Sequence, residues 1–448
     1  MSTRVIIQMR YSQPVARAAF EAAPIAPAFP LTGISGLQLD EAYQPVPVPA
    51  KSRRSDIPRT FSSMFSFDTT PEASSYLMRA EVEDNALDNM MENARQNDNV
   101  VGVFADVKMQ AIATCPAGPL GTDRDVERLL EIDELQNRGL DGTGVNVVIV
   151  DSGVNIPYLN QRGKNPDFNE QLSWGPSGNE PVGQMPVGHG TMCAYDVCIA
   201  APNCVLIDHA LLRPTPLDAL LSDAVRSYDV LLRWLNGEKD SIFAGDDIPA
   251  SLVVNNSWGM FHPSWDFPIG SPSNYSDNPD HPFNIIVESL EDAGADILFA
   301  AGNCGRECAD PRCDGATSEG IYGANSSDAV LSVAGVVTTN KDRIGYSTQG
   351  PGRLVWMKPD IACYTHFAGS GVYPADGGTS AATPVAAGVI AAIRRAYPSN
   401  ILPPAVLRNL IRRTAEDRGR QGFDFDYGFG ILDVKNLLTA IDNYLSER

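Results

Sequence analysis

Basic residues are scarce in this 448-residue chain: 34 lysines and arginines stand against 55 aspartates and glutamates, which gives a formal net charge of −21. So acidic a chain disfavours nucleic acid and anionic membranes as partners, and it favours basic or neutral ones. No apolar run approaches the roughly 18 residues that a membrane-spanning helix needs. The composition therefore predicts no nucleic acid and no membrane as a partner.

A recognisable secretory signal is also lacking, because the apolar stretch near Met1 is too short. The chain has eight cysteines, at positions 115, 193, 198, 204, 304, 308, 313 and 363. Without a signal we expect reduced thiols and a cytoplasmic protein, or export without a recognisable signal peptide. Cys304, Cys308 and Cys313 form a local cluster with no zinc-type spacing, so we expect no metal there and, in an exported protein, a disulfide.

Length and composition predict a globular protein of two domains. Hydrophobic residues make up 43% and charged residues 20% of the chain, which is ordinary for a protein with a large core. A chain of 448 residues is long for one domain. The proline- and glycine-containing run 115–119 has the composition of a linker. We expect a small domain over residues 1–115 and a large one over 119–446.

The first domain is predicted to be a small α+β unit. We expect strands over Val5–Tyr11 and Val100–Met109 and a polar helix over Asn85–Gln96, with structure resuming at Tyr76 before that helix. Between Pro14 and Pro58 the composition shifts to proline and alanine, which predicts an extended, mobile segment.

The second domain alternates apolar strands with helices. The predicted strands are 145–150, 251–254, 296–301 and 329–337, and the predicted helices between them are 217–235 and 285–293. This alternation indicates an α/β fold, with a mostly parallel sheet covered by helices on both faces. Active sites in such sheets lie at the carboxyl ends of the strands. Asp151 lies at one of these ends.

Two further residues suit acyl-transfer chemistry. Ser380 follows Gly377-Gly378-Thr379 at the start of an apolar helix, where backbone N–H groups favour developing negative charge, although a serine there can also be an ordinary helix cap. His189 lies between glycines, and a lone histidine more often has a structural role. Nucleophilic catalysis needs a serine, a base and an orienting carboxylate, and the chain order Asp151, His189, Ser380 is one that supplies this trio.

These motifs resemble those of a known family. The runs 151–153, 188–191 and 378–384 look like the three active-site motifs of subtilisin-like serine proteases. Phe299-Ala300-Ala301-Gly302-Asn303 resembles the segment with the oxyanion-hole asparagine, which implies that role for Asn303. The run 255–259 resembles the edge strand that pairs with substrate, which implies substrate contacts for Ser257, Trp258 and Gly259. The resemblance covers about 122–441. It departs at Met192 and Cys193, where the family often has a second histidine.

The resemblance implies a serine endopeptidase that hydrolyses peptide bonds through a Ser-His-Asp triad and an acyl-enzyme. No cofactor is required; structural calcium is common in the family, but the sequence names no ligands. The rival interpretation is a catalytically silent, peptide-binding pseudoprotease. An esterase would carry a Gly-x-Ser-x-Gly elbow with the histidine last in the chain, and the order here differs.

Residues 1–115 more weakly resemble the family's inhibitory propeptide. That resemblance implies an intramolecular inhibitor whose last strand delivers the following residues into the cleft, and autoprocessing between about Lys108 and Thr122. The alternative is an unrelated N-terminal domain.

A last resemblance is local. The run 301–315 looks like the kexin and furin branch, in which a Cys-Asp-Gly supplies an aspartate to the primary specificity pocket. It implies that Asp314, eleven residues after Asn303, faces an arginine or lysine of the substrate. The acidic cluster that this branch carries after Ser-Trp-Gly is absent. The alternative is an apolar pocket, with Asp314 in a solvated turn.

Overall fold

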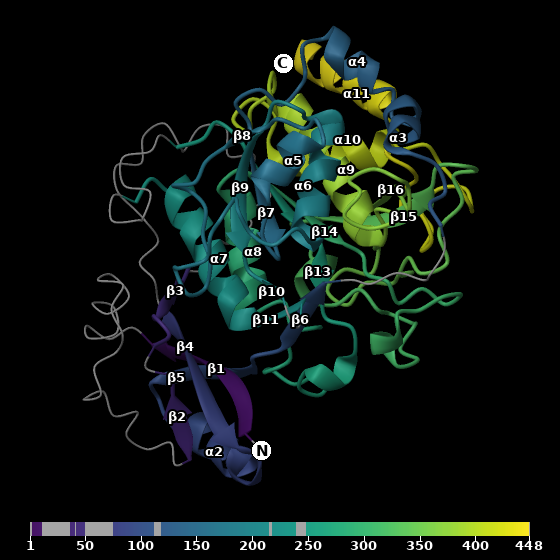
Figure 1. Cartoon of the computed structure of the whole chain (residues 1–448). Coiled ribbons are helices and arrows are strands. Elements are labelled where there is room, and N and C mark those ends of the chain that lie inside the picture. The colour runs from purple at the N-terminus through teal and green to yellow at the C-terminus, as the bar shows by residue number, and fades with distance from the viewer. Residues whose placement is uncertain are drawn as a thin grey trace.

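The computed structural model describes residues 2–10, 36–40, 42–49, 75–111, 118–214, 217–238 and 248–447. A small unit formed by the N-terminal residues packs below a larger α/β unit, and one strand runs from the first into the second (Figure 1). Within these ranges, none of the helices combines the length and the apolar character required to cross a membrane.

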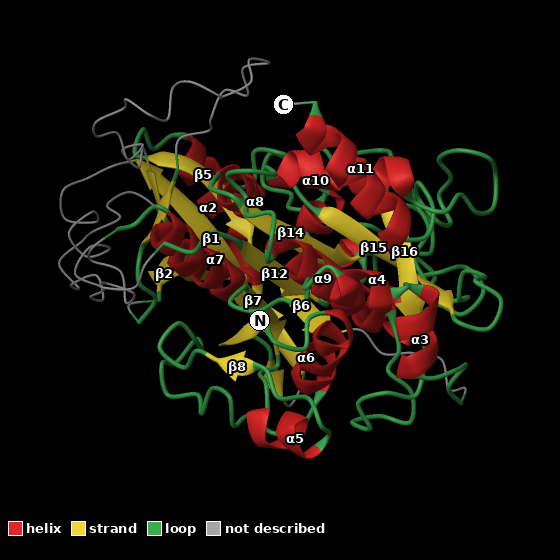
Figure 2. Ribbon diagram, turned by 90° about the horizontal axis from the view of Figure 1, so that it is seen from above, coloured by secondary structure: helices red, strands yellow, loops and turns green. Residues whose placement is uncertain are grey.

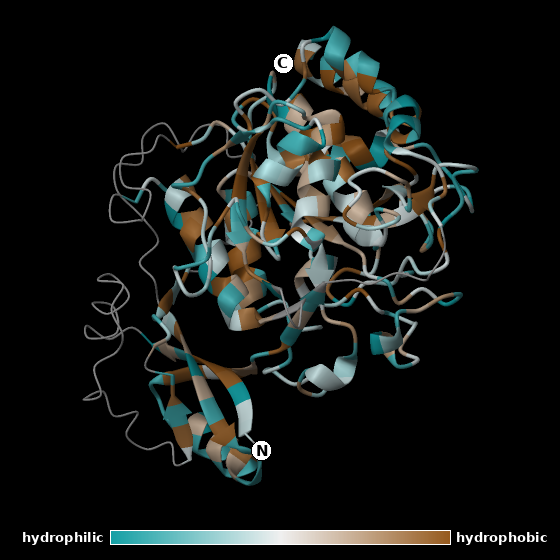
Figure 3. Cartoon of the chain, viewed as in Figure 1, coloured by the Kyte–Doolittle hydropathy of each residue, from teal (hydrophilic) through white to brown (hydrophobic). Residues whose placement is uncertain are grey.

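The larger unit is built on a seven-stranded sheet with the order β16-β15-β14-β12-β7-β9-β8. Every neighbouring pair in it is parallel. The strands are β7 Asn146–Asp151, β8 Asp167–Phe168, β9 Val205–Ala210, β12 Leu252–Asn256, β14 Ala295–Ala300, β15 Leu331–Val337 and β16 Ile361–Thr365. The strands β12, β14 and β15 are buried along their whole length, and most of their residues are apolar, as the colouring by hydropathy in Figure 3 reflects. The predicted parallel sheet is confirmed.

Helices cover both faces of this sheet, as predicted (Figure 2). Successive side chains of β7 enter different cores: Val147 packs in the core that contains helices α6 and α9, and Val148 in the core that contains α7 and α8. This alternation is the period of two that a strand imposes. The helices of the larger unit are α3 Asp123–Leu129, α4 Ile132–Asn137, α5 Ile156–Gln161, α6 His189–Ala200, α7 Leu221–Leu235, α8 Pro282–Asp292, α9 Thr379–Arg394, α10 Pro404–Thr414 and α11 Val434–Ser446.

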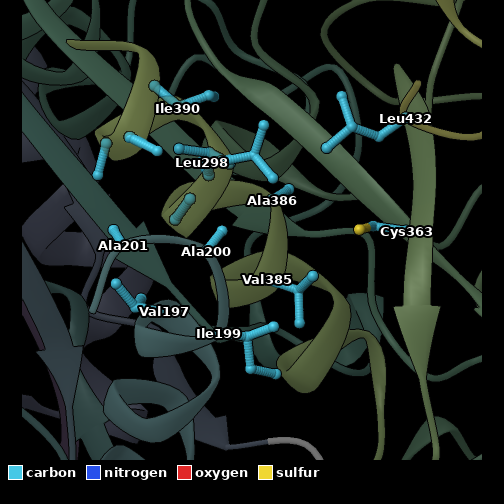
Figure 4. Packing of buried hydrophobic residues seen from close by; sticks show 14 of the residues in the cluster. Val197, Ile199, Ala200, Ala201, Leu298, Cys363, Val385, Ala386, Ile390 and Leu432 are labelled. Atoms are coloured by element: carbon cyan, nitrogen blue, oxygen red, sulfur yellow. The ribbon is translucent and has the colours of Figure 1, made fainter. Parts of the chain in front are cut away.

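Helices α6 and α9 pack very closely. Small side chains, among them Ala200, Ala201 and Ala386, line the contact (Figure 4). At Gly388 an added Cβ would lie 2.3 Å from the carbonyl oxygen of Val197, so only glycine fits. Since α6 begins at His189 and α9 begins one residue before Ser380, this crossing fixes the two predicted site residues relative to each other.

The smaller unit is an antiparallel sheet with the order β2-β4-β1-β5, and β3 also pairs with β4. Its strands are β1 Ser2–Arg10, β2 Leu37–Leu39, β3 Val46–Val48, β4 Ser75–Glu83 and β5 Val100–Ala105, and its helix α2 spans Leu87–Arg95 after the 3₁₀ turn η1 Asp84–Ala86. One face buries α2, while Ile6, Leu77 and Phe104 on the other face join the core around α7 and α8.

Two predicted elements need correction. The strand expected over Val100–Met109 is divided: β5 ends at Ala105, and β6 Lys108–Ala111 leaves for the larger unit. The helix expected from Leu217 begins at Leu221, because Leu217–Leu220 forms strand β11, which pairs with β6. Hydrophobicity alone did not show where β5 ends and β6 begins, or where β11 ends and α7 begins.

The mobile segment expected between Pro14 and Pro58 is wrong for two of its parts. Leu37–Leu39 and Val46–Val48 are strands, and the valines of β3 are buried against the larger unit. Pro47 is tolerated because β4 is the one strand of the described residues that pairs with β3, so its other edge needs no backbone N–H from Pro47. The remainder of the segment lies outside the described residues.

The crossing of α6 and α9 yields a stability prediction. Gly388→Val should lower the free energy of unfolding by about 2 kcal/mol, because the new side chain must push the two helices apart. Chemical denaturation measures this. Gly118→Val is the control, since no atom lies within 4 Å of a Cβ there. Equal stability of the two variants would contradict the close crossing.

Candidate active site

Asp151 and His189 form a buried pair at the carboxyl end of β7. The Nδ1 atom of His189 lies 2.8 Å from Oδ1 and 3.0 Å from Oδ2 of Asp151. Oδ1 also accepts a hydrogen bond from the backbone N–H of Ser152 at 2.7 Å. Asp151 is fully buried and His189 is 5% exposed. A carboxylate so placed holds the imidazole in one tautomer, with Nε2 as the basic atom.

The residues around this pair explain why each motif reads as it does. The hydroxyl of Ser152 accepts the N–H of Gly190 at 2.9 Å, and the hydroxyl of Thr191 accepts the N–H of Asn155 at 3.1 Å. A Cβ at Gly190 would lie 2.5 Å from the carbonyl oxygen of Gly153. The loop after β7 and the start of α6 are therefore held together by two side-chain hydroxyls and by a backbone contact that a side chain at Gly190 would prevent.

Cys193, one turn after His189, lies beneath the pair. Its Sγ is 3.9 Å from both Asp151 Oδ2 and His189 Nδ1, and 3.6 Å from the carbonyl oxygen of Ser380. Burial raises the pKa of this thiol well above its ordinary value. Among the described residues, one group of three histidine, cysteine or acidic side chains has its ligand atoms close enough to share a metal ion: Asp151, His189 and Cys193. A metal ion bound by these three residues would bind the imidazole of His189, which is the predicted base.

Ser380 lies beside these residues at the second position of α9. Its hydroxyl donates to the carbonyl oxygen of Ser257 at 3.3 Å, while the hydroxyl of Ser257 donates to the carbonyl of Ser380 at 3.0 Å. Nε2 of His189 is buried and has no hydrogen-bond partner among the described residues. Hydrogen bonds between nucleophile and base are often unformed in the absence of substrate. Proton transfer requires the hydroxyl to turn from Ser257 to Nε2.

Asn303 follows β14 and points its amide at the start of α9. Its Oδ1 accepts from the N–H of Thr379 at 3.0 Å and from the Thr379 hydroxyl at 3.1 Å, and that hydroxyl accepts from the N–H of Gly302 at 3.1 Å. Nδ2 faces Gly378, where a Cβ would lie 2.9 Å from it and where φ is +77°. Glycine is thus required two residues before Ser380, where the amide nitrogen of Asn303 lies against the backbone.

A pocket opens beside Asn303. Its lining residues are all uncharged: Gly259, Met260, Phe261, Ala301, Gly302, Asn303, Cys304, Gly320, Tyr322 and Asn325. The amide of Asn325 donates to the carbonyls of Trp258 and Ala300, which ties the two walls together. The position next to the predicted nucleophile and oxyanion donor makes this the candidate primary specificity pocket.

Asp314 is not among the residues that line this pocket, so the structure does not support its prediction as the pocket carboxylate. It is exposed and follows the 3₁₀ helix η3 Pro311–Cys313 with a left-handed φ of 43°. A disulfide between Cys304 and Cys313 holds the preceding residue inside the protein. The turn after that anchor directs Asp314 to solvent, as the alternative of a solvated turn requires.

The same disulfide corrects the expectation of reduced thiols. Cys304 and Cys313 are bonded, as the interpretation of a disulfide within the cluster proposed. Cys193, Cys198, Cys204 and Cys363 are free and buried.

The strand predicted to contact substrate is occupied by the chain itself. β13 Trp258–Gly259 pairs antiparallel with β6, with Trp258 opposite Ala111 and Gly259 opposite Gln110. On its other side β6 pairs with β11, which continues to β10 Arg213–Pro214 (Figure 1). The N-terminal unit therefore places an extended strand in the groove next to Ser257 and Ser380.

Sequence reasoning missed several residues that build this site. The hydroxyl of Thr379 orients Asn303, and that of Ser152 orients Gly190. Both residues lie inside recognised motifs, where a hydroxyl side chain was the feature that could have indicated these roles. β11 forms the second wall of the groove but was assigned to a helix. A strand as short as Leu217–Leu220 is defined mainly by its partner, β6.

Comparison with known proteins agrees with the fold. Residues 142–430 match the model of the subtilase family, which covers more than half of the chain. The parallel α/β fold and this match define the class, that of the subtilisin-like serine proteases. The chain belongs to the subtilase family.

Relatives include M-protease of Shouchella clausii, 29% identical over 300 residues that make up 67% of this chain and 65% of the relative. Subtilisin Savinase of Lederbergia lenta is 28% identical over 67% of this chain and 92% of the relative. Fervidolysin from Fervidobacterium pennivorans, described as a keratinolytic enzyme related to subtilisin, has a similar solved structure, with a TM-score of 0.58 and 14% identity. That match covers 98% of this chain and 61% of fervidolysin, and at this identity it shows the fold alone.

The orientation of Asn303 yields the next prediction. Asn303→Ala should lower kcat for peptide hydrolysis by about 10²–10³ with little change in KM, because the amide would act on the transition state rather than on bound substrate. Steady-state kinetics on a fluorogenic peptide measures both. The control is Asn340→Ala, a substitution in a surface turn where the side-chain amide bonds Asp342. A wild-type kcat in Asn303→Ala would remove Asn303 from the oxyanion hole.

Proposed function

We propose that this protein is a serine endopeptidase whose nucleophile is Ser380. The observation that carries the proposal is the buried contact between His189 Nδ1 and Asp151 next to a serine at a helix start. His189 Nε2 takes the hydroxyl proton as Ser380 Oγ attacks the substrate carbonyl carbon, and Asp151 stabilises the imidazolium that results.

Asn303 and the N-terminus of α9 stabilise the charge that develops on the carbonyl oxygen. As the tetrahedral intermediate collapses, His189 gives its proton to the leaving amine and an acyl-enzyme remains on Ser380. Water, deprotonated by His189, then attacks the ester and releases the second product. The rival, a silent peptide-binding pseudoprotease, would lack one of these groups, and here every position is filled.

The N-terminal unit is proposed to be an intramolecular inhibitor. Strand β6 lies between β11 and β13 in antiparallel register, as an extended peptide substrate would. Met109 is fully buried in this groove. We take residues 1–115 as the inhibitory domain and 119–446 as the catalytic domain; residues 112–117 between them lie outside the described residues.

A polar contact at the N-terminus of α7 supports this inhibitory role. The carboxylate of Asp106 accepts from the N–H of Ser222 at 2.9 Å and from its hydroxyl at 2.8 Å. Burial raises the pKa of Asp106 to about 6, against the effect of these two bonds. The hydroxyl of Tyr43 donates to the carbonyl of Ser222 at 2.9 Å. Both side chains come from the N-terminal unit, so the fit to α7 is specific.

The register of β6 indicates where processing should occur. Ala111 lies opposite Trp258, and the next residue along β13 towards the nucleophile is Ser257, whose carbonyl contacts Ser380. An antiparallel strand advances towards Ser257 as it passes Ala111. We therefore propose cleavage after Ala111 and before Thr122.

This proposal predicts two fragments for the wild type on a reducing denaturing gel and one full-length chain for Ser380→Ala. Terminal sequencing of the larger fragment should identify a first residue between 113 and 122. Asp314→Ala, an exposed substitution near the site, should be processed like the wild type. Identical full-length bands for wild type and Ser380→Ala would refute autoprocessing.

The uncharged pocket replaces the earlier expectation of a basic preference. We propose that it takes an uncharged side chain before the scissile bond, because an arginine there would be desolvated without a carboxylate partner. For paired peptides that differ only in leucine or arginine at that position, kcat/KM should favour leucine by about tenfold or more. Asp314→Ala should leave the ratio unchanged. A preference for arginine would contradict this assignment of the pocket.

The disulfide bears on the compartment. Disulfides persist in oxidising environments, so the bond between Cys304 and Cys313 supports an exported protease acting on protein or peptide substrates. No organic cofactor takes part in the proposed chemistry. Calcium is common in the family, and no ligand set for it is assigned here.

A further inference from the structure

Beyond the pocket, the side chain of Gln110 on β6 contacts the catalytic domain. Gln110 lies opposite Gly259, and its Oε1 accepts a hydrogen bond from Nη1 of Arg312 at 3.3 Å. We propose that Arg312 selects substrates with an acceptor side chain, glutamine or glutamate, at the position that pairs with Gly259. This inference rests on the proposed endopeptidase function.

The substrate position follows from the register of β6. The carbonyl of Ser257 contacts the hydroxyl of Ser380, so in the proposed mechanism we take a substrate residue opposite Ser257 as the one directly before the scissile bond. The residue opposite Trp258 is then the second before the bond, and the residue opposite Gly259 is the third. Gln110 occupies this third position in the intramolecular complex. Its contact with Arg312 therefore represents a substrate subsite.

Arg312 is fixed before any substrate binds. Its Nε donates to Oδ1 of Asp310 at 2.9 Å and its Nη2 to Oδ2 at 2.7 Å, a two-point contact to a carboxylate whose side chain is 1% exposed. The guanidinium carbon lies 3.9 Å above the centre of the Phe261 ring. Little side-chain entropy remains to be lost on binding, which is the condition for a selective contact.

The chemistry at Nη1 determines the preference. Asp310 engages Nε and Nη2 on one edge of the guanidinium, and Nη1 donates on the side of β6. An amide or carboxylate oxygen accepts this bond; a leucine leaves it unmade; a lysine brings a second positive charge to it. Because Asp310 already balances the charge of Arg312, glutamine should be accepted about as well as glutamate.

The position of Arg312 separates this preference from that of the primary pocket. Phe261 lines the pocket on one side and supports the guanidinium on the other. Arg312 itself does not line the pocket. Its side chain is 27% exposed, so the effect on kcat/KM should be modest, about fivefold for glutamine over leucine.

The experiment uses four fluorogenic peptides identical except at the third residue before the scissile bond, which is glutamine, glutamate, leucine or lysine. Mass spectrometry of the products identifies the bond cleaved. With the processed wild type, kcat/KM for the glutamine and glutamate peptides should exceed that for leucine by about fivefold, and lysine should be poorest. Arg312→Met keeps an aliphatic stem over Phe261 and should reduce the differences to less than twofold.

Two controls keep the outcome interpretable. Arg306→Met removes an exposed arginine of the same loop and should retain the wild-type preference. Arg312→Lys keeps the charge but loses the two-point contact with Asp310, and it should also weaken selection for glutamine. Equal kcat/KM for the four peptides with the wild type, or a preference that survives both Arg312 variants, would overturn the inference and leave the endopeptidase function standing. Failure of the wild type to hydrolyse any peptide would overturn both.

Discussion

The close approach of the loop after β7 to the start of α6 is the constraint on which the site depends. Gly190 lies against the backbone of Gly153, and this contact brings His189 onto Asp151 at hydrogen-bond distance. A second close approach, Gly388 against Val197, seats α9 on α6 and so brings Ser380 to the same place. Both approaches need a residue without a side chain. These two glycines therefore allow the α/β fold to bring Asp151, His189 and Ser380 together.

The groove beside this arrangement is defined from both sides by backbone. β6, an extended segment of the N-terminal unit, lies between the edges of β13 and β11 and pairs with both. Main-chain bonds of this kind are insensitive to sequence, so they give affinity without selecting a substrate. In the proposed function, selection depends on two side-chain contacts, the uncharged pocket beside Asn303 and the fixed guanidinium of Arg312. The pairing of β6 with β13 and β11 is thus the common basis of the proposed inhibition and the proposed substrate choice.

The class of fold and the candidate residues of the site could be predicted from the sequence because each lies in a short run whose residue types the backbone requires. Gly378 is needed for its positive φ, and Gly190 for its contact with Gly153. Asp314 could not be placed, because its direction depends on a turn fixed by a disulfide to Cys304. For a related reason β11 was assigned to a helix and β6 was not separated from β5: β11 and β6 are defined by their pairing with each other. The catalytic roles of Asp151, His189, Ser380 and Asn303 remain predictions.

The most direct measurement is labelling with a fluorophosphonate, which reacts with a serine hydroxyl activated by a neighbouring base. In wild-type protein freed of its N-terminal domain, one equivalent should be incorporated, and peptide mass spectrometry should locate it on Ser380. The variant His189→Ala should remain unlabelled, since the base that activates Ser380 is gone. An unlabelled Ser380 in folded wild-type protein, or equal labelling of His189→Ala, would contradict the account.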